Sequence, residues 1–517
     1  MTPVVPPPAG HPEASGEPSL AARAAAGAQW LAVSAVAEKL LGFATTAVLA
    51  RLLAPEQFGL YALAFVAMDA LGALKNLGLD AAIVQRRDHE DRAADAAFLV
   101  LPFISGSLFL LLFLGAPLVA GWLGAPAVAG PLRGLGLALV VVGLGAVPNA
   151  LLQKKLLFGA RVTANLLGAA AFSAIAIALA LAGWGVWSLV IAHLVRTAVT
   201  SGVLWLRVEW RPRWALDRTI LREMLGFSTY VMAANLLSVA AVSADKVLVG
   251  RLLGPTSVGF YSLAYGLAFL FRGQVGPRLY QVAFPAFAEA QDDPERLRRG
   301  VLRVVQVLLS VALPFAALVG LLSKDLLTIA YGPQWAVAAP VLAALAAGGA
   351  FAGLSSGLNP LLLARGHSKA QFATSLGQLV LFLSTAPWAI ARWGLVGAAA
   401  AATVSATVSA VVRAAVVSRD LALRWQDWAG AARAPVLAGV TMAATILITG
   451  TLAGSWAQRL APFWHLAVFG GLGGGAYMFV LWKADPSMIR WLGTWISAPF
   501  RGRAHRPTET GGTTTTE

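Results

Sequence analysis

Long apolar stretches, separated by short polar or basic segments, follow one another along nearly the whole chain. A helix that crosses the hydrocarbon core of a bilayer needs about 20 mostly apolar residues. Fourteen stretches reach that length, at residues 28–53, 57–83, 94–122, 128–152, 160–182, 186–206, 225–253, 256–282, 299–322, 336–362, 369–390, 394–417, 433–455 and 463–483. The pattern therefore predicts an all-α integral membrane protein with about 14 transmembrane helices.

The composition agrees with a membrane protein and excludes several kinds of site. Only 12% of the 517 residues are charged, whereas an ordinary soluble domain carries about 25%. The chain has no cysteine, which excludes disulfides, thiol catalysis and cysteine metal sites. The six histidines are scattered without the spacing of a metal motif, so we expect no metal centre and no cofactor.

The distribution of basic residues predicts the orientation in the membrane. With the N-terminus inside, 28 of the 39 lysines and arginines fall in cytoplasmic segments and six fall outside. Such a bias is typical of cytoplasmic loops, so both termini are predicted to be cytoplasmic. The same bias accounts for the net charge of +15, and nucleic acid is not an expected partner.

One sequence motif, a tight turn at the start of a helix, occurs twice in the chain. Residues 51–64 read RLLAPEQFGLYALA and residues 251–264 read RLLGPTSVGFYSLA, with eight of fourteen positions identical. Both copies end an odd-numbered span, and because six helices separate them the orientation is preserved. A weaker echo joins GWGVW at 183–187 with RWGLVG at 392–397. We infer two parallel six-helix repeats around a central cavity, followed by two further helices. The alternative is that proline and glycine recur because tight turns favour them.

This repeat predicts the organisation of the chain. We expect a disordered cytoplasmic tail at 1–22, an N-lobe of six helices at 23–206, a cytoplasmic linker at 207–224, a C-lobe of six helices at 225–420, helices 13 and 14 at 421–484, an interfacial helix at 485–500 and a disordered tail at 501–517.

Several stretches resemble a known family. They are ARLLAPEQFGLYALA, SADKVLVGRLLGPTSVGFYSLAY, YGPQWAVAAPVLAALA, NPLLLARGHSKA and, most specifically, FPAFAEAQDDPERLRRG. The chain is similar to the Wzx-type oligosaccharide flippases of the polysaccharide transporter family. That family belongs to the multidrug/oligosaccharidyl-lipid/polysaccharide exporter superfamily, which also holds lipid II flippases and multidrug extruders.

The resemblance implies a function in cell-envelope polysaccharide synthesis. A flippase of this family moves an undecaprenyl-pyrophosphate-linked oligosaccharide from the cytoplasmic to the outer leaflet by alternating access, for O-antigen, exopolysaccharide or capsule. It implies the bacterial cytoplasmic (inner) membrane as the location, membrane lipid as a contact, and the polysaccharide polymerase and export machinery as partners. No catalytic residue is expected, because the chain would not be an enzyme.

Charges inside the predicted spans are candidates for function, because a charge at the bilayer centre costs about 2.5–3.5 kcal/mol on insertion scales. At about 100° per residue, polar residues form one stripe on each of four helices. The four stripes consist of Ser34, Glu38 and Thr45; of Asp69, Asn76 and Asp80; of Asn235, Ser238 and Asp245; and of Tyr261, Tyr265 and Arg272. We expect these stripes to line the central cavity.

A pyrophosphate-linked glycan needs cations for its charge, and arginine offers paired donors to phosphate. The predicted substrate contacts are Arg272, Lys75, Lys39, Tyr261, Tyr265 and Asn235. A second set, consisting of Asp245, Lys246, Asp69 and Glu38, either binds a coupling ion, H⁺ or Na⁺, or forms structural pairs.

Two other functions compete with the flippase. An ion-coupled multidrug exporter of the same superfamily would favour an acidic, aromatic cavity, whereas these spans carry Lys39, Lys75, Lys246 and Arg272 beside the acids. A membrane enzyme such as a glycan polymerase needs a sizeable external loop with catalytic groups. The predicted outer loops are all short.

Overall fold

The computed structural model describes residues 20–75, 79–86, 88, 90–213, 218–270, 287–290, 293–486 and 488. Across these ranges the regular secondary structure is helical, which confirms the all-α prediction. Ten of the described helices are long and apolar enough to cross a membrane. The count of about 14 stays a prediction, since two of the described helices each hold two predicted spans.

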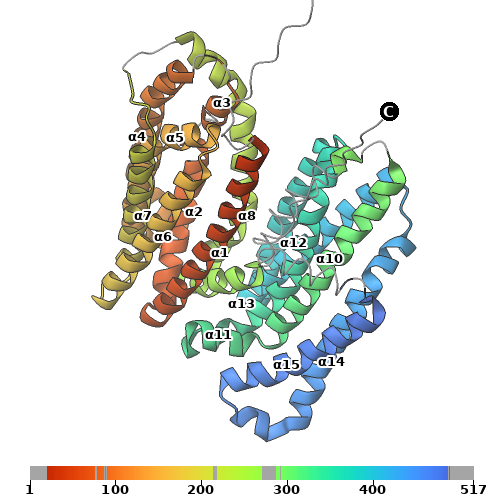
Figure 1. Ribbon diagram of the computed structural model, residues 1–517. Coiled ribbons are helices and arrows are strands. Elements are labelled where there is room, and N and C mark those ends of the chain that lie inside the picture. The colour runs from red at the N-terminus through yellow and green to blue at the C-terminus, as the bar shows by residue number, and fades with distance from the viewer. Residues whose placement is uncertain are drawn as a thin grey trace, which may run out of the picture. The chain divides into compact units, whose positions relative to one another are not determined.

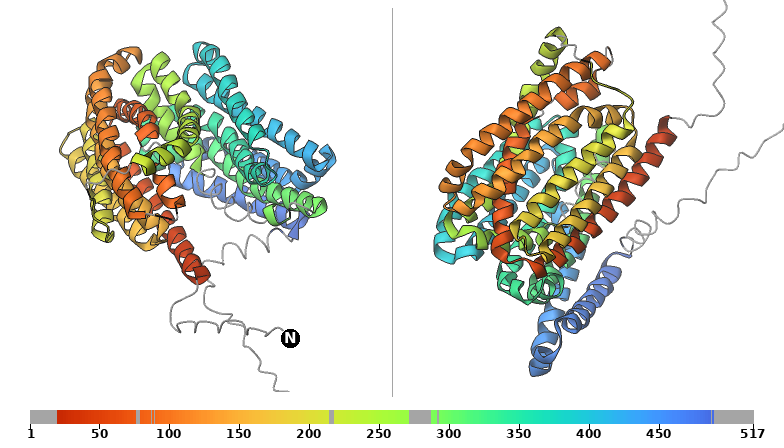
Figure 2. Two further views of the ribbon diagram at one scale, coloured as in Figure 1. Left: turned by 90° about the horizontal axis from the view of Figure 1, so that it is seen from above. Right: turned by 90° about the vertical axis from the view of Figure 1, so that its left-hand side faces the viewer.

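The chain forms two compact units, residues 1–259 and 260–517. The first unit holds α1 (Leu20–Leu52), α2 (Pro55–Lys75), α3 (Leu79–Gln85), α4 (Glu90–Trp122), η1 (Pro126–Val128), α5 (Ala129–Lys154), α6 (Phe158–Leu181), α7 (Val186–Arg207) and most of α8 (Arg218–Ala268). Within this unit α5 packs against α2, α4 and α7, while α6 packs against α1 and α7. These helices run alongside one another (Figures 1 and 2).

The second unit begins within α8 and contains the helices that follow α8 in the chain. These are α10 (Pro294–Leu321), α11 (Ser323–Tyr331), η2 (Pro333–Ala338), α12 (Ala339–Ala364), α13 (Ser368–Leu421), α14 (Trp425–Arg459) and α15 (Pro462–Ala484). The α10 helix packs against α12 and α14, and α14 packs against α15. The short α11 was not predicted, because nine residues are too few for an apolar span.

The internal repeat is visible in backbone conformation. In the first unit Gly185, just before α7, has φ 54° and ψ −129°. In the second unit Gly394 divides α13 with φ 57° and ψ −135°. The turn after α5 contains Leu156 with φ 56°, and the turn after α12 contains Gly366 with φ 75°. Turns with similar backbone dihedral angles therefore occupy corresponding places in the two predicted repeats.

Some predictions fall partly outside the described residues. The predicted helix 57–83 is described as α2, which reaches Lys75, and α3, which begins at Leu79, with residues 76–78 outside the described ranges. A single helix over 57–83 and the stripe from Asp69 to Asp80 therefore stay predictions. The span 256–282 is described only to residue 270, and the predicted interfacial helix at 485–500 lies almost wholly outside the described residues. The predicted lobe and tail boundaries stay predictions.

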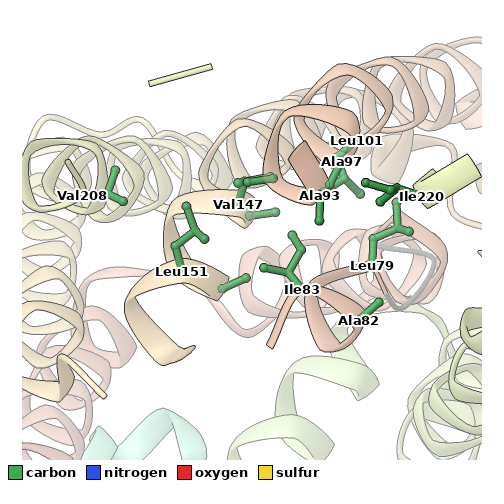
Figure 3. Packing of buried hydrophobic residues seen from close by; sticks show 13 residues of the cluster. Leu79, Ala82, Ile83, Ala93, Ala97, Leu101, Val147, Leu151, Val208 and Ile220 are labelled. Carbon is green, nitrogen blue, oxygen red and sulfur yellow. The ribbon is translucent and has the colours of Figure 1, made fainter. Parts of the chain in front are cut away.

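A hydrophobic cluster joins the ends of several helices in the first unit (Figure 3). Leu79 and Ile83 of α3 meet Ala93 and Ala97 of α4 there, and Val208, just after α7, belongs to the same cluster. The residues after α7 are therefore packed against the helices at this end of the unit.

A buried carboxylate holds the same segment. Asp95 is 3% exposed, and its Oδ1 accepts hydrogen bonds from Trp210 Nε1 at 3.1 Å and from the Arg213 backbone N–H at 3.0 Å. The Trp210 ring meets Phe98 of α4 edge to face at a centroid distance of 5.7 Å and stacks on Trp205 of α7 at 5.9 Å. The chain leaving α7 is thus anchored to α4 by both polar and aromatic contacts.

Asp95→Ala should release this segment. Two hydrogen bonds to a charged acceptor contribute about 1.5–3 kcal/mol each, so we expect lower thermal stability and faster trypsin cleavage after Arg213. Asp95→Asn keeps an acceptor oxygen and should behave nearly as wild type. The matched control is Asp91→Ala, four residues earlier on α4, where the side chain is exposed. Equal cleavage rates in Asp95→Ala and Asp91→Ala would contradict the anchoring role.

Candidate functional site

An ion pair joins two helices of the first unit. Arg196 Nη2 of α7 donates to Glu38 Oε1 of α1 at 2.6 Å. The α6 helix packs against both α1 and α7. At Gly168 of α6 an added Cβ would overlap the Thr200 hydroxyl, so the small residue permits close approach of α6 and α7 beside Arg196. The guanidinium can therefore reach past α6 to α1.

The pair lies deep along both helices. Arg196 is ten residues after Val186, the first residue of α7, which corresponds to about 15 Å at 1.5 Å per residue. Glu38 is fourteen residues before Leu52, the last residue of α1, or about 21 Å. Since the hydrocarbon core is about 30 Å thick, the charges lie near the middle of a membrane span.

A chain of aromatic side chains begins beside the arginine. Tyr61 of α2 lies close enough to Arg196 for the guanidinium charge to act on its phenol. The Tyr61 ring packs on Phe65 at 5.9 Å, and Phe65 meets His193 of α7 edge to face at 5.5 Å. We call Glu38, Arg196, Tyr61, Phe65 and His193 the mid-span cluster.

The charged side chains of the mid-span cluster are partly open. The Arg196 side chain is 41% exposed and that of Glu38 is 31% exposed. Charges within spans almost always face a bundle interior or a water-filled cavity, since lipid contact is costly. Such a pair can either lock two helices together or exchange its carboxylate for another anion.

The structure describes the side chains of some predicted substrate contacts but not of others. Lys39 is exposed on α1, one residue from Glu38. Lys75 ends α2 and Asn235 lies within α8, but the side chains of both are outside the described part. Arg272 lies outside the described residues altogether. Their contact with substrate stays a prediction.

The two predicted tyrosines lie on α8 beyond its break at Gly254. Tyr261 is fully buried, with its ring 6.1 Å from Tyr265. Tyr265 is half-buried and stacks on Phe269 at 4.1 Å. These three rings form a ladder on one helix face, and Tyr265 and Phe269 are both partly exposed in this conformation.

The remaining predicted charges have different surroundings. Asp245 is buried, and its Oδ1 accepts a hydrogen bond from the Lys246 backbone N–H at 2.8 Å. Asp69 is half-buried on α2. The stripe on α1 faces partly into packed protein, because Thr45 is 3% exposed and its hydroxyl donates to Ser173 of α6 at 2.7 Å. The prediction that all residues of one stripe line a cavity therefore does not hold for Thr45, which packs against α6.

Sequence reasoning missed a buried arginine in the second unit. Arg413 of α13 is 6% exposed. It donates to the side chains of Thr374, Asn359 and Ser375 at 3.1, 2.8 and 3.0 Å. These partners lie on α12 and on the part of α13 before Gly394, so the guanidinium joins three helical segments. Arg413 lies near the end of a predicted span, and a basic residue at such a position ordinarily indicates only which end of the helix is cytoplasmic.

Among the described residues no group of three or more histidine, cysteine, aspartate or glutamate side chains is arranged to hold a metal ion.

Comparisons with known proteins add to this geometry. Residues 48–340 match the family model described as polysaccharide biosynthesis protein. The teichuronic acid biosynthesis protein TuaB of Bacillus subtilis (strain 168) is 24% identical over 373 residues, 71% of this chain and 76% of TuaB. The lipopolysaccharide biosynthesis protein WzxC of Escherichia coli (strain K12) is 28% identical over 382 residues, 71% of this chain and 75% of WzxC.

Among solved structures, the lipid II flippase MurJ in an inward closed conformation is similar with a TM-score of 0.71 and 13% identity. The match covers 89% of this chain and 99% of MurJ. At this identity the likeness shows a common fold. The family model covers more than half of the 517 residues, and the chain belongs to the polysaccharide biosynthesis protein family.

Proposed function

We propose that this protein is a flippase that moves a polyprenyl-diphosphate-linked oligosaccharide from the cytoplasmic to the outer leaflet by alternating access. The membership in the polysaccharide biosynthesis family carries the proposal, since the matched residues include most of the membrane helices. The names of TuaB and WzxC place those relatives in cell-envelope polysaccharide synthesis. The bacterial cytoplasmic membrane, cytoplasmic termini and a non-enzymatic role belong to the same proposal.

The charge of the site supports an anionic cargo. The mid-span cluster contains a guanidinium cation, that of Arg196. A lipid diphosphate is an anion that must pass the same apolar core, and a guanidinium offers it paired donors. The further proposed contacts remain Arg272, Lys75, Lys39, Tyr261, Tyr265 and Asn235. The residues proposed for H⁺ or Na⁺ coupling or for structural pairing remain Asp245, Lys246, Asp69 and Glu38.

A multidrug exporter of cationic compounds is the alternative. Its cavity would need acidic groups free of cations, whereas Glu38 is paired with Arg196. The arginine therefore disfavours a cationic cargo.

Depleting the protein in its host tests the function. Complete lipid-linked repeat units should accumulate in the cytoplasmic leaflet, inaccessible to reagents added outside, while surface polysaccharide falls. Extraction of the lipid-linked sugars with and without surface labelling measures both. Intact surface polysaccharide without accumulation, in a host lacking a related flippase, would contradict the proposal.

A further inference from the structure

We propose that Arg196 is the cation that holds the diphosphate of the cargo, and that Glu38 occupies this cation when no cargo is bound. The inference rests on the proposed function and assigns a specific residue to its cargo. Arg196 was absent from the substrate contacts that the sequence predicted, and the structure identifies it by its partner, its depth and its exposure.

The bond between the two side chains leaves room for a second anion. It runs through one guanidinium nitrogen, Nη2, to one carboxylate oxygen. A guanidinium carries five N–H donors in a planar fork. Two parallel donors match two oxygens of a phosphate, which gives a shorter and stronger contact than a single hydrogen bond. A diphosphate can therefore replace Glu38 with more bonds than it breaks.

The exposure of the pair makes exchange feasible. A fully buried ion pair would have to unpack before a ligand reached it, but 41% of the Arg196 side chain is already exposed. Its depth of about 15 Å along α7 corresponds to the middle of the bilayer, where transporters place their substrates. A headgroup crossing the membrane must pass this level.

Glu38 then has two effects on transport. Without cargo it neutralises Arg196, whose unpaired charge would be costly within a membrane span. With cargo present it competes for the guanidinium, which limits how tightly the diphosphate is held. A flippase needs such a limit, because a cargo that binds too tightly is not released to the other leaflet.

Neutral replacements separate cargo binding from structural pairing. Glu38→Gln keeps the size of the side chain, while Arg196→Gln keeps a hydrogen-bonding group on a shorter side chain, and the double variant combines both changes. The full-length protein in lipid nanodiscs is titrated with geranylgeranyl diphosphate, and with geranylgeranyl monophosphate for comparison. The matched control is Arg207→Gln, an exposed arginine at the end of the same helix. Each variant is first shown to elute as folded protein from a sizing column.

Arg196→Gln should weaken diphosphate binding about tenfold or more, as expected for loss of a hydrogen bond to a charged group. The double variant should show the same loss of diphosphate affinity, because it lacks the Arg196 cation even though its two glutamine side chains can still hydrogen-bond to each other. Glu38→Gln should bind the diphosphate more tightly and release it more slowly. Arg207→Gln should bind like wild type.

Two results would overturn the assignment in distinguishable ways. Wild-type affinity in the folded double variant would show that the pair only locks α1 to α7, and the proposed function would stand. A folded wild-type protein that binds no prenyl diphosphate would overturn both the assignment and the proposed cargo class.

Discussion

Gly59→Ala should destabilise the protein, although alanine favours a helix more than glycine does. A Cβ at Gly59 would overlap the backbone carbonyl oxygen of Pro255, and a Cβ at Gly259 would overlap that of Pro55. All four residues lie in the first unit. Neither carbonyl can move without shifting its helix, and overpacking of this kind costs about 1–3 kcal/mol. Gly259→Ala should therefore have the same effect.

Two glycines of α4 provide the control. An added Cβ at Gly106 or Gly115 meets nothing within 4 Å. Their replacement by alanine should raise stability by up to about 1 kcal/mol through helix propensity alone. The thermal midpoint of the purified protein should therefore fall for Gly59→Ala and rise for Gly115→Ala. A rise in both variants would contradict the backbone contact.

This contact explains why the same turn occurs twice in the sequence. In each copy a proline begins the helix and a glycine follows four residues later, at Pro55 and Gly59 and at Pro255 and Gly259. The glycine of each copy contacts the proline carbonyl of the other. Because each glycine faces the backbone of the other copy, both copies need a glycine at this position. The motif is therefore present in both copies.

Arg413→Leu should strongly destabilise the second unit. The buried guanidinium donates hydrogen bonds to the side chains of Asn359, Thr374 and Ser375. Removing it leaves these acceptors unpaired, and each buried polar group left without a partner costs about 1–3 kcal/mol. We expect little folded protein in the membrane. Arg413→Lys should recover only part of the stability, because an ammonium lacks the planar fork.

The control for Arg413 lies on the same helix. Arg419 is exposed, and its replacement by leucine should change stability by no more than about 0.5 kcal/mol. Membrane abundance and the thermal midpoint of the detergent-purified protein measure both variants. Equal stability of Arg413→Leu and Arg419→Leu would show that the hydrogen bonds of Arg413 contribute nothing.

The sequence allowed the helices to be predicted more reliably than the site. Apolar length alone locates a membrane helix, and the turns at Gly185 and Gly394 recur in both sequence and backbone. Pairing across long separations is different. Glu38 and Arg196 lie 158 residues apart, and no local pattern shows that their helices place them together.

The burial of two charged side chains could not be predicted from the sequence either. Asp95 and Arg413 lie near the ends of predicted spans, where charged residues ordinarily face water or signal topology, yet both are buried and hydrogen-bonded. Their partners come from segments that only the fold brings close. The residue we considered first for substrate contact, Arg272, lies outside the described part of the chain, so its role stays a prediction.

Transport by the purified protein tests the central claim most directly. The full chain is reconstituted into liposomes that carry a fluorescent prenyl-diphosphate oligosaccharide in both leaflets, and a membrane-impermeant quencher is added outside. We expect fluorescence from the inner leaflet to become quenchable with the wild-type protein and to do so far more slowly with Arg196→Gln. Folded wild-type protein that leaves the inner-leaflet fluorescence as protected as in protein-free liposomes would contradict the flippase function.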